Sequence, residues 1–183
     1  MNVIELLATL FSLSSVVASV RNSVLTWPLG IVGILFYMLH FHNIGLLANT
    51  ILQLVFLAQC LYGWYNWKSS DDIKVSSLNK IENTYFGLLF FAINFLVIFL
   101  LNTFSESKCV ILDSTTTSLS LVAMILLANK KMQTWYYWII ADIIYILLFL
   151  SNKDYLSMIT YSVFLVLAIT GLKQWNNMTI KRR

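Results

Sequence analysis

Charged residues are scarce in this chain of 183 residues. Lysine, arginine, aspartate and glutamate make up 11% of it, whereas a soluble domain averages roughly 25%. So few charges cannot cover the surface of a domain in water, and 59% of the residues are hydrophobic. Such an excess of apolar side chains is typical of a protein whose helices face lipid. The composition therefore predicts an all-α integral membrane protein.

Proline, glycine and cysteine are also rare. One proline and six glycines leave little material for long flexible linkers. Cys60 and Cys109 lie in or beside apolar runs without metal-ligand or CxxC spacing, so we expect them to be packing residues. His40 and His42 fall in an expected loop without a third ligand, so we expect no metal and no cofactor. The net charge of +4 is spread between the apolar segments, which excludes a nucleic-acid-binding patch.

Seven apolar segments are candidates for crossing a bilayer, because a spanning helix needs about 20 mostly apolar residues. They cover residues 3–20, 24–41, 44–66, 84–102, 109–128, 134–150 and 155–172. The first and fifth carry serine and threonine clusters, whose hydroxyls can bond to their own helix or to a neighbour. The first also lacks the basic start and the cleavage motif of a signal peptide, so we expect a retained helix. The sequence predicts seven transmembrane helices in a single membrane domain, residues 1–183, with six or eight spans as alternatives.

The placement of lysine and arginine predicts the orientation of the chain. With seven spans, only Lys108 and Lys153 fall on one side of the membrane. The other side holds Arg21, Lys68, Lys74, Lys80, Lys130, Lys131, Lys173, Lys181, Arg182 and Arg183. The richer side should be cytoplasmic. We therefore expect a multi-pass membrane protein with the N-terminus outside and the C-terminus inside.

The sequence repeats itself when it is shifted by 108 residues without a gap. The coinciding residues are mostly aromatic or glycine, which match by chance less often than leucines do in membrane segments. The pairs are Trp27/Trp135, Tyr37/Tyr145, Phe41/Phe149, Phe56/Phe164, Gly63/Gly171 and Trp67/Trp175. We expect one three-helix repeat at 1–67, a linker with the fourth helix at 68–108, a second repeat at 109–175 and a basic cytoplasmic tail at 176–183. Because an odd linker helix restores the direction of the chain, the two halves should form a 3+1+3 parallel repeat.

One carboxylate lies in the middle of the apolar run WYYWIIADIIYILLF. Trp138, Asp142 and Tyr145 are spaced i, i+4 and i+7, which places them on one helix face. A carboxylate near the bilayer centre costs about 2.5–3.5 kcal/mol on insertion scales, so Asp142 should face the bundle or a water-filled cavity. A tryptophan face attracts a cation by roughly 0.5–2 kcal/mol, and a nearby carboxylate can pair with its charge. The alternative is that Asp142 is protonated, or bonded to a serine or threonine of another helix.

Three further side chains complete the predicted substrate site. Gln53 lies in the third segment, and its amide can both donate and accept hydrogen bonds to a ligand. Tyr161, in the seventh segment, is the repeat partner of Gln53. Asn94 lies in the middle of the fourth segment, where it either contacts the substrate or only braces the halves.

Four stretches of the chain resemble the PnuC family of vitamin transporters. They are WPLGIVGILFYM, LQLVFLAQCLYGWYNWK, WYYWIIADIIYILLF and YSVFLVLAITGLKQW. The resemblance runs from about Val3 to Trp175 and is strongest to the nicotinamide riboside transporters. Its most specific parts are the Trp-x-x-x-Asn/Asp pattern at Trp138 and Asp142 and the two Gly-x-x-x-Trp endings. It implies a 3+1+3 fold similar to that of the SWEET sugar transporters, and facilitated diffusion of an unphosphorylated vitamin that a cytoplasmic kinase then traps.

The resemblance has one departure that bears on the substrate. Asp142 stands where asparagine is common in the family, and a carboxylate suits the cationic ring of thiamine as well as that of nicotinamide riboside. The expected partners are therefore one of these two small molecules and the lipid bilayer, and a homo-oligomer is left open. A membrane enzyme is disfavoured because H-E-x-x-H and G-x-S-x-G motifs are absent. A structural subunit is disfavoured because a repeat with intramembrane polar residues favours a translocation path.

Overall fold

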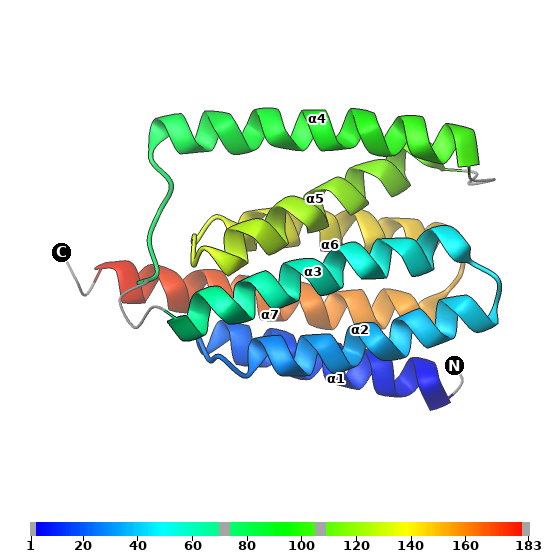
Figure 1. Cartoon of the computed structure of the whole chain (residues 1–183), viewed down its shortest axis with the longest axis horizontal. Helices are drawn as coiled ribbons and strands as arrows, with labels where there is room; N and C mark the ends of the chain where they lie inside the picture. The colour runs from blue at the N-terminus through cyan, green and yellow to red at the C-terminus, as the bar shows by residue number, and fades with distance from the viewer. Residues whose placement is uncertain (1–2, 70–73, 105–108, 181–183) are drawn as a thin grey trace. The chain divides into compact units, whose positions relative to one another are not determined.

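The computed structural model describes residues 3–69, 74–104 and 109–180, and these residues form seven α-helices (Figure 1). The helices are α1 (Val3–Val20), α2 (Thr26–Asn43), α3 (Leu47–Ser69), α4 (Lys80–Phe104), α5 (Val110–Ala128), α6 (Thr134–Ser151) and α7 (Tyr155–Ile180). The predicted all-α class is confirmed. Four of the basic residues used to predict the orientation lie outside the described residues. They are Lys108, Lys181, Arg182 and Arg183.

Five of the helices, α1, α4, α5, α6 and α7, are long and apolar enough to cross a membrane. The helices α2 and α3 fall short because polar side chains dilute them. In α2 these include His40 and His42, which lie in the last helical turn. The prediction that both histidines lie in a loop is therefore wrong. The helix continues to Asn43, and the Ile44 N–H still donates to the His40 carbonyl at 3.2 Å, four residues back as in a helix.

The chain divides into two compact units. The first comprises Met1–Lys74 and Ala128–Lys130, and the second comprises Val75–Leu127 and Lys131–Arg183. Within the first unit, α1 packs on α2 and α2 packs on α3. Within the second unit, α6 packs on α7. The predicted basic tail from residue 176 is helical through Ile180, where α7 ends.

Buried hydroxyls of α5 are satisfied by the helix itself. Ser114, Thr116, Ser118 and Ser120 are each at most 6% exposed. The Ser118 hydroxyl donates to the Ser114 carbonyl at 2.7 Å, and the Ser120 hydroxyl donates to the Thr116 carbonyl at 2.9 Å. A serine bonded back to its own helix turn leaves no unpaired donor in an apolar environment. These bonds explain how α5 can contain several serines and threonines and still be suitable for crossing a membrane.

Each unit contains one pair of buried tryptophans with the same geometry. In the first unit the ring centroids of Trp27 and Trp67 lie 5.2 Å apart at an interplanar angle of 87°. In the second unit the centroids of Trp135 and Trp175 lie 5.4 Å apart at 89°. Edge-to-face packing of this kind is favoured by the quadrupole of the rings. The two pairs stand 108 residues apart in sequence, and the local packing therefore follows the sequence repeat.

The turns between the helices also recur at that spacing. Asn22 and Lys130 take the left-handed conformation, with φ of 52° and 49°. Gly45 and Lys153 do so as well, with φ of 76° and 57°. The helices that these turns enclose, α2 and α6, have the same length of 18 residues. The repeat is thus a repeat of local structure, including two lysines that adopt a conformation unusual for a side chain of their size.

Asp154 caps the start of α7 and gives a first testable prediction. Its carboxylate accepts bonds from the Ser157 hydroxyl at 2.7 Å and the Ser157 N–H at 3.2 Å, and these bonds hold the pKa of the carboxyl below its usual range. We expect Asp154→Ala to lower the free energy of unfolding by about 1 kcal/mol. A depressed folded-state pKa gives stability above the unfolded-state pKa, so the difference between wild type and variant should shrink as the pH falls through the folded-state value.

Thermal unfolding of wild type and Asp154→Ala in detergent, from pH 7 downward, measures this difference. Asp154→Asn is the matched control, because asparagine is an equally good cap that does not titrate. A cap role is contradicted if Asp154→Asn is as unstable as Asp154→Ala at pH 7.

Candidate functional site

The helix α6 carries the predicted face of Trp138, Asp142 and Tyr145. Asp142 is 4% exposed, although its side chain is charged in water. Within residues 3–69, 74–104 and 109–180, no hydrogen bond or ion pair reaches its carboxylate. The described structure therefore supplies no serine or threonine partner of the kind that the helix-packing alternative requires. A buried carboxylate without a protein partner is costly, and a bound ligand can offset that cost.

Trp138 lies one helical turn before Asp142 and is half-buried. In the part of the chain that the structure describes, its ring makes no contact with another aromatic ring. Trp135, three residues earlier, is 1% exposed and packs edge-on against Trp175. Trp135 is therefore a packing residue, whereas Trp138 has no aromatic packing partner among the described residues.

Tyr145 and Tyr161, both predicted for the site, lie against each other across α6 and α7. Their ring centroids are 4.4 Å apart. Two phenylalanines extend this aromatic cluster: Phe149 lies 5.3 Å from Tyr161, and Phe164 lies 5.8 Å from it, measured between ring centroids. Neither phenylalanine was among the predicted site residues. The spacing of Phe149 four residues after Tyr145 is the signal that could have placed it on the same face.

The two predicted amides have different surroundings. Asn94 is half-buried on α4, and its Nδ2 donates to the Ser114 hydroxyl of α5 at a long 3.5 Å. This contact supports a bracing role for Asn94. Gln53 is half-buried on α3 and belongs to the first unit. The structure thus brings Tyr145 and Tyr161 into contact, keeps Trp138 and Asp142 on the same helix as Tyr145, and places Gln53 in a separate unit.

The predicted site residues Trp138 and Asp142 have no counterparts in the first sequence repeat. The residue 108 positions before Trp138 is Gly30, and the one before Asp142 is Ile34. A Cβ at position 30 would lie 3.1 Å from the Ser15 hydroxyl, so the first repeat has little space for a large side chain there. The tryptophan pairs and the turns are shared by both repeats and serve the fold. Trp138 and Asp142 are not shared, and this separates them from the scaffold.

Comparisons with known proteins bear on these observations. The chain matches the model of a family described as nicotinamide mononucleotide transporter over residues 2–177. Relatives include the nicotinamide riboside transporters PnuC of Escherichia coli (strain K12) and of Shigella flexneri. Each is 22% identical over 208 residues, which cover 98% of this chain and 87% of the relative.

A solved structure has the same fold. The crystal structure of the vitamin B3 transporter PnuC superimposes with a TM-score of 0.81 at 17% identity, covering 98% of this chain and 83% of that one. The predicted resemblance to PnuC is confirmed, and the protein is a vitamin transporter of the membrane, not an enzyme. From the match over nearly its whole length, the chain belongs to the nicotinamide mononucleotide transporter family.

Proposed function

We propose that the chain carries nicotinamide riboside across the bacterial plasma membrane by facilitated diffusion. The observation that carries the proposal is Asp142, a buried carboxylate. It lies one turn from Trp138, and among the described residues the carboxylate has no hydrogen-bond or ion-pair partner and the indole contacts no other aromatic ring. Nicotinamide riboside has a cationic aromatic ring and a ribose. The ring can stack on Trp138 while its charge is balanced by Asp142.

The aromatic cluster and the amides supply the remaining contacts in this proposal. Tyr145 and Tyr161 offer hydroxyls to the ribose, and their rings, packed against each other and against Phe149, form an aromatic wall beside the ligand. Gln53 and Asn94 offer amides that can bond the carboxamide of the ligand, which both donates and accepts. Binding by stacking and hydrogen bonds alone needs no ion gradient, and this fits uncoupled flux.

The charge distribution favours the riboside over the mononucleotide named in the description of the family. A phosphate group is recognised by arginine, lysine or helix N-termini. The basic residues that the structure describes lie in the connections or toward helix ends, as Lys68, Lys80 and Lys173 do. In addition, the carboxylate of Asp142 repels a phosphate dianion. An unphosphorylated substrate would be retained once a cytoplasmic kinase adds a phosphate, which is the trapping step that we propose.

The arrangement that we propose for transport is a 3+1+3 parallel repeat with the N-terminus outside and the C-terminus inside. Its support is the repetition of the tryptophan pairs, of the left-handed turns and of the α2 and α6 lengths, together with the uneven distribution of basic residues. Thiamine is the second candidate substrate, because its cationic ring fits the same carboxylate and tryptophan.

Ligand binding to detergent-purified protein, measured by calorimetry, tests the substrate. We expect nicotinamide riboside to bind and thiamine, riboflavin and a neutral deoxynucleoside to bind weakly or not at all. Asp142→Asn should weaken binding by about tenfold, which corresponds to roughly 1.4 kcal/mol for the loss of one charge pair. Asp154→Asn, which also removes one acid but lies outside the helices, is the matched control and should bind as wild type does.

Other outcomes of this experiment are equally informative. Binding of thiamine alone would keep the fold and the site and replace the substrate. Binding of none of the four ligands by wild-type protein would refute the proposal. Unchanged affinity in Asp142→Asn would return Asp142 to a role in helix packing.

A further inference from the structure

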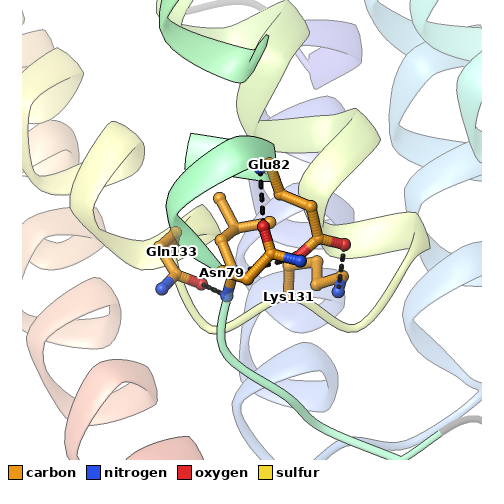
Figure 2. A network of polar contacts seen from close by, with 5 residues as sticks. Asn79, Glu82, Lys131 and Gln133 are labelled. Atoms are coloured by element: carbon orange, nitrogen blue, oxygen red, sulfur yellow. Dashed lines mark hydrogen bonds and ion pairs between the residues drawn. The ribbon is translucent and has the colours of Figure 1, made fainter. Parts of the chain in front are cut away.

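The start of α4 is organised by a reciprocal cap within the second unit (Figure 2). The Asn79 side chain accepts the Glu82 N–H at 2.8 Å, and the Glu82 carboxylate accepts the Asn79 N–H at 2.8 Å. This is a capping box, in which each side chain satisfies a backbone donor that the helix leaves unpaired. The cap fixes the position of the short segment that leads into α4.

That segment is bonded to the turn before α6. Ser76 and Lys131 form a parallel bridge, and the Met132 N–H donates to the Ser76 carbonyl at 2.8 Å. The Lys131 ammonium also pairs with the Glu82 carboxylate at 2.9 Å. Main-chain and side-chain contacts thus join the same two stretches. Figure 2 shows the side-chain contact between Lys131 and Glu82.

Gln133 makes the contact nearest to α6. It occupies the N-cap position of that helix, yet its side chain makes no capping bond there. Its Oε1 instead accepts the backbone N–H of Leu78 at 3.0 Å (Figure 2). The Gln133 side chain therefore connects the start of α6 to the segment before α4.

The equivalent helix of the first repeat has no such connection in the described structure. Leu25 occupies the N-cap position of α2, is 62% exposed and has no polar side chain to bond elsewhere. The turn there is local, because Ser23 accepts the Leu25 N–H at 3.3 Å. The helix α2 is also the one that has Gly30 and Ile34 in place of Trp138 and Asp142. The connection therefore occurs at the helix that carries the site chemistry.

We propose that Gln133 is a positioning residue for substrate binding, which acts by fixing α6 to the segment before α4. The inference rests on the proposed function of Trp138 and Asp142. At a rise of about 1.5 Å per residue, Trp138 lies about 8 Å and Asp142 about 14 Å along the helix axis from Gln133. A helix transmits a displacement of its end over such distances, and binding groups lose affinity when they shift by a fraction of an ångström.

Two substitutions at position 133 separate positioning from mere packing. Gln133→Met keeps the length of the side chain and removes the acceptor, whereas Gln133→Glu keeps an acceptor oxygen for the Leu78 N–H. The experiment measures the affinity for nicotinamide riboside by calorimetry, amide hydrogen exchange at Leu78 and along α6, and thermal unfolding. Ser23→Ala, in the equivalent turn of the first unit, is the control.

We expect Gln133→Met to weaken binding by roughly fivefold, a loss typical of one hydrogen bond, and to speed exchange at Leu78 and through the first turns of α6. Gln133→Glu and Ser23→Ala should bind as wild type does. Equal affinities of Gln133→Met and wild type would overturn the inference, as would equal weakening in Gln133→Met and Gln133→Glu.

Failure of the proposed function would look different. In that case wild-type protein itself would not bind nicotinamide riboside, and the exchange measurement would still decide the role of Gln133. Unchanged exchange along α6 in Gln133→Met would overturn the positioning role whatever the ligand is, and faster exchange would support it.

Discussion

Replacing Gly171 with alanine should lower the free energy of unfolding by about 3 kcal/mol, the upper part of the range for overpacking a core. A Cβ at this position would lie 2.5 Å from the ring of Trp135, which is far inside van der Waals contact. The ring cannot move aside easily, because Trp135 is 1% exposed and packs against Trp175. Gly63→Ala should have a comparable effect, since its Cβ would overlap the ring of Trp27.

Gly87→Ala is the matched control for this prediction. Gly87 lies inside α4, and apart from the adjacent residues and backbone of its own helix no atom lies within 4 Å of the position that its Cβ would take. Alanine there should stabilise the helix by about 0.5–1 kcal/mol. Thermal unfolding of the three variants in detergent measures the differences. If Gly171→Ala were as stable as Gly87→Ala, the tryptophan pair would tolerate displacement. The prediction that the Trp135 ring requires a glycine at position 171 would then be wrong.

Replacing Trp138 with alanine should weaken the binding of nicotinamide riboside by roughly 2 kcal/mol, or about 30-fold, which is the range for stacking of a nucleobase on an aromatic side chain. The reason is that Trp138 has a ring that contacts no other ring in the described structure, one turn from the carboxylate of Asp142. Trp138→Phe should fall between wild type and alanine, because phenylalanine retains a smaller and less electron-rich face.

Trp64 provides the control for Trp138. It is 37% exposed on α3 and is not one of the residues of the proposed site, so Trp64→Ala removes an indole but none of the proposed contacts. Its affinity should match that of wild type in the same calorimetric titration. Equal weakening in both variants would point to a general loss of folded protein, and no weakening in Trp138→Ala would exclude stacking on this ring.

The sequence predicted the helices well where hydrophobicity alone sets their limits. The segment 3–20 agrees with α1 at both ends, and 134–150 agrees with α6 to one residue. It failed where polar residues belong to a helix. The helix α4 begins at Lys80, four residues before the predicted start, because the capping box of Asn79 and Glu82 supports a polar first turn. The pattern Asn-x-x-Glu at residues 79–82 is the sequence signal that would have predicted this earlier start.

The candidate site was predictable to the extent that it is local. Helical periodicity places Trp138, Asp142 and Tyr145 on one face without knowledge of any other helix. The role of Gln133 could not be read in this way, because its partner Leu78 is 55 residues away in sequence and the bond depends on tertiary structure. Both Tyr145 and Tyr161 were predicted as site residues, but the contact between their rings was not predicted. It depends on how α6 packs on α7, which the sequence does not determine.

The uneven repeat has a consequence for stoichiometry. Nicotinamide riboside has no internal symmetry, and two identical recognition faces would offer it two equivalent poses that compete with each other. Because Gly30 and Ile34 replace the tryptophan and the carboxylate in the first repeat, that degeneracy is removed, and each chain should take up a single ligand in a single orientation. A gene duplication followed by loss of one recognition face is a direct route to such a carrier.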